Sequence, residues 1–509
     1  MTDLLTSAQM RAIERAAMDS GAVTGRGLME RAGAGVVQAT LAHWPGLAQG
    51  ARRAVVLCGP GNNGGDGYVI ARLLADRGWN VDLLALAEPG TPDAAGARAD
   101  WPGPVLRLDQ LPSDLSGVVV FDAVFGTGLL RPISREIGLT LAQARAGGAR
   151  IVAVDILSGL CADSGRLRSD AGDAGVMADL TVTFDSPRPG HLLDMGGDLS
   201  GALAVADIGT GPWREALRGQ DGASISRLAT PVVPLRKVAG HKYAYGHALI
   251  LSGGPGRGGA ARLAARAALR VGAGLVTLAP PPAALAENAG RLDAIMLHPM
   301  PDGAALAQAL SDPRLSALCL GPGLGVSARE VGLVAAALAA RRPTVLDADA
   351  LTVIARDPAL RSALHEGCVL TPHDGEFARL FPEIAGALSE PPKDGAPAMS
   401  RLDAARAAAQ EVGATVLLKG AATVIATPDG QAVVHAALRE RAAPWLATAG
   451  AGDVLAGLIA GLLARGAAPL AAAQTGAWLH VEAARAFGPG LIAEDLPEAL
   501  PEVLRGLDP

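Results

Sequence analysis

Apolar residues follow a helical period at the start of the chain and form short, uninterrupted runs after that. Residues 8–40 alternate apolar and charged side chains at helical spacing, which predicts one or two amphipathic helices. Apolar runs at 54–58, 80–86, 118–130, 149–160 and 179–184 predict buried strands, and several of them lead into glycine-rich loops. Strands that alternate with helices indicate a parallel, doubly wound α/β sheet.

The same pattern starts again after an aperiodic stretch. Residues 209–235 carry Gly, Pro, Ser and Asp without a period, so we expect a linker, which we place at 213–230. Strand-and-loop units follow from HALILS (247–252) to TVLLKGAATVIA (415–426), and Ala-rich helices close the chain. The sequence therefore predicts two α/β domains, residues 1–212 and 231–509.

Composition narrows the class of protein. Half of the residues are hydrophobic but only 3% are aromatic, so we expect cores of Ala, Val and Leu. The net charge is -6 with no basic run, which argues against nucleic acid as the main partner. The N-terminus is amphipathic rather than signal-like, and no apolar run has the length of a membrane span, so we expect a cytoplasmic protein without a membrane partner. The four cysteines are widely spaced, and we expect buried structural thiols.

The loop GPGNNGGDG (59–67) follows a predicted strand and opens a predicted helix. Its glycines allow the backbone to approach a phosphate, which the N-terminus of the helix favours. Asn62, Asn63 and Asp66 add polar side chains that an ordinary turn does not need. We therefore expect a binding loop for a phosphate-bearing ligand.

Two carboxylates stand at strand ends in the same half of the chain. Asp122 lies in FDAVFGTG and Asp155 in VDILSG, and each follows an apolar run, where a carboxylate is costly unless it has partners. Asn63, Asp122 and Ser158 together offer hard oxygen ligands for an alkali or alkaline-earth cation. A cap or loop anchor is the alternative for each aspartate taken alone.

The motif AGAGDVLAG (449–457) gives the sharpest signal in the second half. It precedes a long apolar helix, so the backbone N–H groups of Gly450, Ala451 and Gly452 are placed to bind an anion. Asp453 then lies where it can take a proton from a hydroxyl that attacks phosphorus. The alternative is a helix cap with glycines for the turn.

Other strand ends of the second half carry weaker signals. Lys419 and Thr423 flank a strand turn, and the lysine can act as a point charge for phosphate. The loop GPGLG (321–325) and His373 in TPHDGE stand at further strand ends. The glycines of GGPGRGG lack the acidic residue of a dinucleotide fingerprint, and the chain contains no Walker A sequence.

Taken in order, these motifs resemble those of the bifunctional NAD(P)H-hydrate repair enzymes. The resemblance covers nearly the whole chain and rests on LMERAG (28–33), GPGNNGGDG, FDAVFGTGL, VDILSGL, GHKYAYGHALILSGG (240–254), GPGLG, LDADAL (346–351), TPHDGE, LKGAATVI and ATAGAGDVLAG. It implies a Rossmann-like epimerase domain that interconverts the R and S hydrates of NADH and NADPH. It also implies a ribokinase-like dehydratase domain that uses ADP, with Mg²⁺, to phosphorylate the S hydrate and then eliminates phosphate.

The resemblance also implies roles for particular residues. Asp155 and Asp453 match catalytic carboxylates that also bind substrate, and Asn63, Asp122 and Ser158 match K⁺ ligands. The epimerase substrate loops correspond to Asn62, Asn63, Gly64, Gly65 and Asp66, and to Gly126, Thr127, Gly128, Leu129, Leu130, Arg131 and Pro132. The dehydratase substrate site corresponds to Ala260, Gly323, His373 and Asp453, and the ADP site to Lys419, Gly420, Ala421, Ala422, Thr423 and Gly452. Assemblies of identical chains are common in the family, so a homo-oligomer is expected.

Three positions depart from the family pattern, and three rival functions stay open. Ala443 stands near a usual Asn, Ala449 replaces a Gly before the anion hole, and Leu157 replaces a common Pro. The rivals are a vitamin or sugar kinase with an accessory domain, an N-terminal half that only binds or scaffolds, and an NAD(P)-dependent dehydrogenase.

Overall fold

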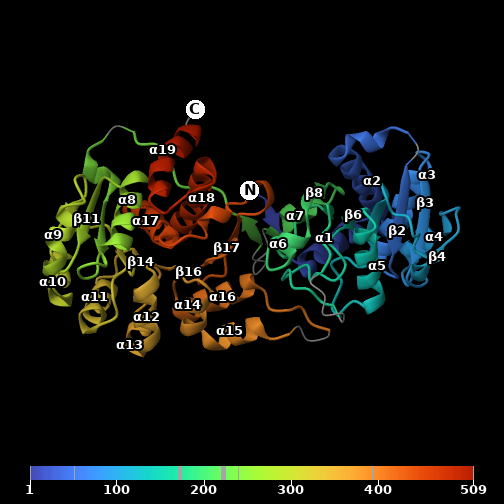
Figure 1. Cartoon of the computed structure of the whole chain (residues 1–509). Coiled ribbons are helices and arrows are strands. Elements are labelled where there is room, and N and C mark those ends of the chain that lie inside the picture. The colour runs from blue at the N-terminus through green and yellow to red at the C-terminus, as the bar shows by residue number, and fades with distance from the viewer. Residues whose placement is uncertain are drawn as a thin grey trace. The chain divides into compact units, whose positions relative to one another are not determined.

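The structure is a computed structural model that describes residues 2–50, 52–169, 175–218, 225–238, 240–391 and 395–507. The chain divides into two compact units (Figure 1). The first unit contains Thr2–Ile225 together with Glu390–Ser400, and the second contains Ser226–Ser389 and Arg401–Pro509.

The first unit is built on a parallel sheet in the order β4-β3-β2-β5-β6-β7-β8. Its strands are β2 (Arg53–Cys58), β3 (Asn80–Ala85), β4 (Leu106–Arg107), β5 (Val119–Ala123), β6 (Arg150–Val154), β7 (Leu180–Phe184) and β8 (Ala202–Ala206). The helices are α1 (Ser7–Asp19), α2 (Gly25–His43), α3 (Asn62–Ala75), α4 (Pro92–Ala99), α5 (Arg135–Ala146), α6 (Gly196–Leu199) and α7 (Gly211–Arg218). The expected parallel sheet with alternating helices is confirmed.

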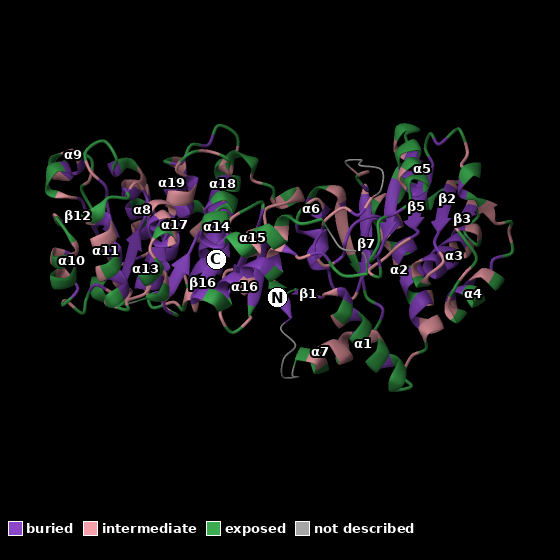
Figure 2. Ribbon diagram, turned by 90° about the horizontal axis from the view of Figure 1, so that it is seen from below, coloured by how far each residue is buried: buried purple, intermediate pink, exposed green. Residues whose placement is uncertain are grey.

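The central strands β2, β5, β6 and β7 are buried on both faces, because helices cover both sides of the sheet (Figure 2). The residues of β5, for example, are all buried, which explains why its sequence is apolar apart from Asp122. The stretch 118–130, predicted as a strand that leads into a glycine loop, forms a strand that ends at Ala123 and a loop after it. That loop contributes directly to the site described below.

The second unit contains a mixed sheet in the order β9-β18-β17-β16-β15-β14-β13-β10-β11-β12. The pairs from β12 to β16 are parallel, whereas β16, β17 and β18 are connected as antiparallel neighbours. The strands are β9 (Ser226–Leu228), β10 (His247–Leu251), β11 (Leu275–Ala279), β12 (Met296–Leu297), β13 (Ala317–Leu320), β14 (Thr344–Leu346), β15 (Cys368–Leu370), β16 (Thr415–Leu418), β17 (Ala422–Ala426) and β18 (Ala432–Ala436).

Helices of small residues pack on this sheet. They are α8 (Gly258–Arg270), α9 (Leu285–Ala289), α10 (Gly303–Ala309), α11 (Ala328–Ala339), α12 (Ala348–Arg356), α13 (Pro358–Ser362), α14 (Asp374–Leu380), α15 (Pro382–Ser389), α16 (Arg401–Val412), α17 (Ala451–Ala464), α18 (Pro469–Phe487) and α19 (Asp495–Leu507). A Cβ atom added to Gly457 of α17 would lie 2.1 Å from the carbonyl oxygen of Ala264 in α8. Only glycine permits this close approach, which seats α17 and its N-terminal loop.

Two further expectations concern the linker and the thiols. The stretch predicted as a linker over 213–230 contains the last residues of α7 and all of β9, while residues 219–224 lie outside the described residues. All four cysteines are buried and free, as expected. Among the described residues, no helix combines the length and apolar character that crossing a membrane requires.

Candidate active sites at the strand ends

The first site forms where β2, β5 and β6 end at the same edge of the parallel sheet. Asp155 follows β6 directly and has a φ of 65°, in the left-handed region that non-glycine residues seldom occupy. Such strain at a polar residue beside glycine loops is typical of functional sites.

The carboxylate of Asp155 is held by the loops around it. Its Oδ2 accepts a hydrogen bond from the backbone N–H of Thr127 (3.1 Å), and its Oδ1 accepts one from Oγ1 of Thr183 (3.0 Å). The guanidinium of Arg188 lies 3.7 Å from Oδ1. Asp155 is therefore fixed in direction rather than free to act as a solvated loop side chain.

Asn63 and Asp155 approach each other across Gly126. A Cβ atom added to Gly126 would lie 3.0 Å from Oδ2 of Asp155 and 3.1 Å from Oδ1 of Asn63. The absent side chain thus leaves a small space bounded by the two polar groups. The structure brings together Asn63, Gly126 and Asp155, of which the first and the last are 92 positions apart in the sequence.

Asp122 and Ser158 form a buried hydrogen-bonded pair beneath this site. Oδ1 of Asp122 accepts from Oγ of Ser158 (2.6 Å), and Oδ2 accepts from the backbone N–H of Ser158 (2.7 Å). Burial raises the pKa of Asp122, although the hydrogen bonds from Ser158 and Val124 act in the opposite direction. Among the described residues, no Lys, Arg or His forms an ion pair with this carboxylate.

Two more carboxyl groups face the site from helices. Burial, followed by the negative charges of Asp155 and Glu14, raises the pKa of Asp66 well above its usual value. Glu14 on α1 has a pKa raised to about 7, mainly by burial, while Arg188 lowers it. Next to Asp155, the protonated forms of Asp66 and Glu14 are therefore favoured more than they would be in solvent-exposed side chains.

The other predicted residues of the first site line its rim or shape its loops. Asn62 accepts a hydrogen bond from Thr91 (2.6 Å), and Gly64 and Gly65 pack so tightly that an added Cβ would clash with Gly59 and Met29. In the second loop, Leu129 is buried, whereas Gly128, Leu130, Arg131 and Pro132 are exposed.

The second site forms at the carboxyl ends of β13 to β16, next to the N-terminus of α17. Gly450 caps α17 with a φ of 90°, and Asp453 lies in the first turn of the helix. Burial first, and then the charge of Asp347, raises the pKa of Asp453 to about 7, while Lys419 lowers it. A carboxyl group that titrates near neutral pH is suited to general base catalysis.

Lys419 connects the strand ends of the second site. Its Nζ lies 2.9 Å from Oδ1 of Asp347 and 3.6 Å from Oε2 of Glu376. Burial lowers the pKa of Lys419, but the two carboxylates outweigh burial and raise it. A Cβ atom on Gly452 would lie 3.6 Å from the same Nζ, so lysine and anion hole face each other.

The remaining predicted residues of the second site cluster nearby, each with a definite local role. Ala260 and Gly323 are neighbours, since a Cβ on Gly323 would lie 3.3 Å from the Cβ of Ala260. Oγ1 of Thr423 donates to the carbonyl of Gly420 (2.9 Å) and closes the turn after Lys419. His373 caps α14 through Nδ1, which accepts from the N–H of Gly375 (3.0 Å).

Sequence reasoning missed several charged residues of both sites. No sequence pattern by itself singles out Arg188 and Glu14 in the first site, or Asp347 and Glu376 in the second. Asp347 and Glu376 do lie inside quoted motifs, LDADAL and TPHDGE, so their position after apolar strands was an available signal. Arg188 follows β7 in the same way.

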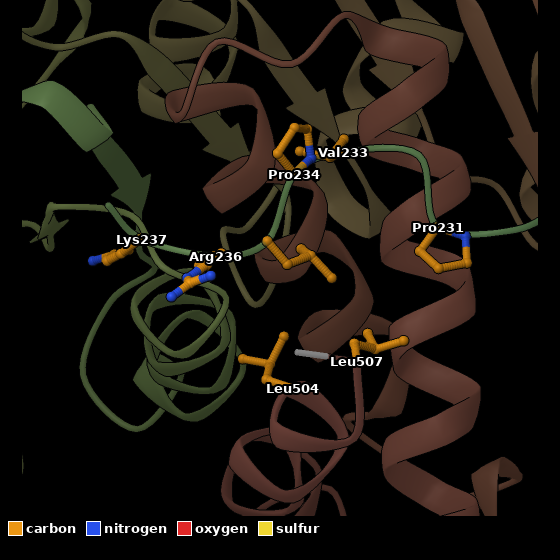
Figure 3. Close-up of a pocket in the computed structure, with 8 residues that line it drawn as sticks. Pro231, Val233, Pro234, Arg236, Lys237, Leu504 and Leu507 are labelled. Atoms are coloured by element: carbon orange, nitrogen blue, oxygen red, sulfur yellow. The ribbon is translucent and has the colours of Figure 1, made fainter. Parts of the chain in front are cut away.

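The cavity in Figure 3 belongs to neither site. It has a volume of about 440 Å³, and its lining comes from the segment before β10 and from α19. The lining residues are Pro231, Val233, Pro234, Leu235, Arg236, Lys237, Leu504 and Leu507. In the part of the chain that the structure describes, no group of three or more His, Cys, Asp or Glu side chains is arranged to hold a metal ion.

The fold and the two sites together define an α/β enzyme of two units. Each unit contains one carboxylate centre, by which we mean the site around Asp155 in the first unit and the site around Asp453 in the second. Comparison with known proteins makes the class specific. Residues 248–502 match the family described as NAD(P)H-hydrate dehydratase, and residues 25–190 match the family described as YjeF-related protein N-terminus.

Relatives match over nearly the full length of the chain. The bifunctional NAD(P)H-hydrate repair enzyme Nnr of Moorella thermoacetica is 38% identical, covering 99% of this chain and 97% of its own. The enzyme of the same name from Escherichia coli is 34% identical, covering 96% and 92%. A solved ADP/ATP-dependent NAD(P)H-hydrate dehydratase from Bacillus subtilis is 27% identical, with a TM-score of 0.44, and covers 55% of this chain and 95% of its own. The chain belongs to the family of bifunctional NAD(P)H-hydrate repair enzymes.

Membership of this family confirms the predicted function class and both fold types. It decides against a vitamin or sugar kinase and against an NAD(P)-dependent dehydrogenase. The assignment of individual residues to the two reactions is argued next.

Proposed function

We propose that the first unit epimerises hydrated NAD(P)H at Asp155 and that the second unit dehydrates the S epimer at Asp453. The observation that carries this division is that each unit holds one buried carboxylate centre at its strand ends. The proposal assigns epimerisation to the predicted domain 1–212 and dehydration to the predicted domain 231–509.

The hydrate carries a hydroxyl on C6, next to ring nitrogen N1, so its two epimers interconvert by loss and return of water. The C6–O bond breaks as the hydroxyl leaves with an added proton, and the N1 lone pair stabilises the resulting cation. Water then adds to the opposite face and releases a proton. Asp155, directed by Thr127 and Thr183, is placed to exchange that proton and to stabilise the cation.

The first turns of α3 (62–66), which the sequence led us to expect as part of a loop, and the loop 126–132 are proposed to bind the dinucleotide around Asp155. The N-terminus of α3 offers backbone N–H groups to a phosphate, and Gly61 before it carries no side chain. A side chain on Gly126 would crowd both Asn63 and Asp155, and the hydrated ring is proposed to bind against these two groups.

Asn63, Asp122 and Ser158 are proposed as the ligands of a K⁺ ion. Asp122 is fully buried and has no cationic partner among the described residues, and its oxygens have capacity beyond the hydrogen bonds they accept. A monovalent cation there would supply the missing counter-charge and fix the start of α3, which carries Asn63, against the loop that carries Ser158.

In the second unit, Asp453 is proposed to take the proton of the C6 hydroxyl as its oxygen attacks the terminal phosphorus of ADP. AMP leaves, and the C6 phosphate ester then loses phosphate from C6 and a proton from C5, which restores the double bond. Lys419 and the N–H groups at the start of α17 are placed to bind the transferred phosphoryl group. Mg²⁺ bound with ADP would neutralise phosphate charge.

Further contacts of the dehydratase site follow from the same placement. The turn Lys419–Thr423 and Gly452 are proposed to bind ADP, and Ala260, Gly323 and His373 are proposed to bind the hydrated dinucleotide. A cytoplasmic location, the absence of nucleic-acid and membrane partners, and a homo-oligomeric state stay predictions.

A complementation experiment tests the division of labour. Neither Asp155→Asn nor Asp453→Asn should convert a racemic hydrate to completion alone, but a mixture of the two should do so in the presence of ADP. If the mixture converts no more of the hydrate than Asp155→Asn converts alone, one of the two sites does not perform the reaction assigned to it.

A further inference from the structure

One short segment after β7 contacts Asp155 at two separate atoms. Arg188 approaches the carboxylate, and His191, three residues later, approaches the backbone carbonyl. Both side chains are almost completely buried, at 1% and 0% exposure. Neither residue belongs to the site predicted from the sequence.

The hydrogen bonds of His191 define which ring nitrogen carries its proton. The backbone N–H of Arg188 donates to Nδ1 (3.0 Å), so Nδ1 must be an unprotonated acceptor. Nε2 therefore carries the hydrogen and donates it to the carbonyl oxygen of Asp155 (2.9 Å). The imidazole is a neutral link between the segment and Asp155.

This link bears on the strained conformation of Asp155. With φ at 65°, Asp155 departs from the extended backbone of β6, while its N–H still donates to the carbonyl of Val182 (2.8 Å). Its own carbonyl is thereby directed at His191. A residue in a sparsely populated conformation persists only where its surroundings hold it, and His191 is one of the groups that hold it.

Arg188 is itself fixed in place by backbone atoms. One terminal nitrogen donates to the carbonyl of Ser186 (3.1 Å), and the other donates to that of Phe184 (3.3 Å) and lies near Asp155. Its buried Nε has no hydrogen-bond partner within the described part of the chain. Burying a charged arginine with an unpaired nitrogen costs folding free energy. We therefore expect Arg188 to have a function that requires it at this position.

We propose that Arg188 and His191 are positioning residues of the epimerase site, which fix the carboxylate and the backbone of Asp155 against the hydrated ring. The inference rests on the proposed function, because it requires Asp155 to be the proton-exchanging group. Arg188 places a fixed positive charge behind the carboxylate, and His191 holds the left-handed turn. Neither residue touches the substrate.

The proposal predicts an effect on turnover and not on substrate binding. In Arg188→Met and His191→Leu, kcat for epimerisation should fall about tenfold or more, with KM changed less than about twofold. Arg188→Lys keeps the charge and should be faster than Arg188→Met. The control is Arg145→Met, which removes an ion pair with Asp179 elsewhere in the same unit and should leave epimerisation unchanged.

The assay uses the full chain and a racemic hydrate with ADP. Excess Asp155→Asn protein is added to supply dehydratase activity. The rate of the slow phase of NADH recovery then measures the epimerase activity of the tested variant. A blank without that variant is subtracted. Dehydratase rate and thermal melting of each variant check folding. If Arg188→Met does not fold, His191→Leu decides, since it leaves the guanidinium in place.

The possible outcomes separate this inference from the proposed function. Folded Met and Leu variants with wild-type kcat, together with an inactive Asp155→Asn, would overturn the positioning role and leave Asp155 as assigned. An active Asp155→Asn would overturn the proposed function of Asp155 itself. A raised KM with normal kcat would show that Arg188 and His191 serve binding and would also overturn the inference.

Discussion

The Nζ atom of Lys419 lies 2.9 Å from Oδ1 of Asp347, and both charges act on the nearby carboxyl of Asp453. Asp347 raises the pKa of Asp453 and Lys419 lowers it, with burial as the largest cause of a value of about 7. Burial therefore has the largest effect on the pH range in which Asp453 can act as a base, and Asp347 and Lys419 adjust that range in opposite directions.

Dehydration should become faster as the pH rises through about 7 and then level off, because the base must be deprotonated. In Lys419→Met the lowering charge is lost, so the midpoint should move to higher pH. The measurement is the pH dependence of kcat with saturating ADP. Lys237→Met serves as the control, since Lys237 contacts the ring of Tyr245 rather than this site. A midpoint that is unchanged or moves to lower pH would contradict the proposed electrostatics.

Asp453→Asn should abolish ADP-dependent dehydration and leave epimerisation intact. Asparagine keeps the shape of the side chain but cannot accept the hydroxyl proton, and removal of a general base costs about 100-fold or more. Dehydration is followed by NADH absorbance with the S hydrate, and epimerisation by chromatographic separation of the R and S forms. A variant that still dehydrates at the normal rate would rule out Asp453 as the base.

Asp155→Asn should have the reverse effect. The amide keeps a hydrogen-bond acceptor for Thr127 but carries no charge beside Arg188 and cannot exchange a proton. Epimerisation should fall by about 100-fold or more, while dehydration of the S hydrate stays at the wild-type rate. Loss of both activities in a folded protein would contradict the assignment of one centre to each unit.

Gly126→Ala should impair epimerisation without unfolding the protein. The added methyl group would lie within 3.0 Å of Asp155 and 3.1 Å of Asn63, in the space proposed for the hydrated ring. Gly46→Ala is the control in the same unit but outside the proposed site, because nothing lies within 4 Å of its added Cβ. The predicted result is a lower kcat/KM for epimerisation in the first variant only. Equal activities of the two variants would place the substrate elsewhere.

Replacing K⁺ by a bulky organic cation at equal ionic strength should slow epimerisation if Asn63, Asp122 and Ser158 hold K⁺. The same exchange should have no effect on epimerisation by Asp122→Asn, which lacks the buried charge that needs a cation. The rate of R to S conversion is compared for both proteins in both salts. An identical response of wild type and variant would argue against this ligand set.

The sequence predicted elements whose signal is local. β2, β7 and β10 consist mainly of apolar and β-branched residues, a local signal that predicts a buried strand without knowledge of its neighbours in the sheet. Gly450 and Asp453 were recognised because the loop and its helix are adjacent in the chain. The resemblance to the family added roles that spacing alone leaves open.

What the sequence could not predict depends on long-range packing. Lys419 and Asp347 are 72 positions apart, and only the order of β14, β15 and β16 in the sheet brings them together. The contacts of Arg188 with Asp155 depend in the same way on the pairing of β6 and β7. The linker prediction was too broad at its start, because the short α7 carries exposed charged residues that resemble a loop.

The central claim is tested most directly by the recovery of NADH absorbance from a racemic hydrate mixed with the protein, ADP, Mg²⁺ and K⁺. The proposed function predicts recovery of the whole sample in one enzyme-dependent process, because the first unit continuously supplies the S form. Recovery that stops near half, with the rest following only at the rate without protein, would contradict an active epimerase in the first unit.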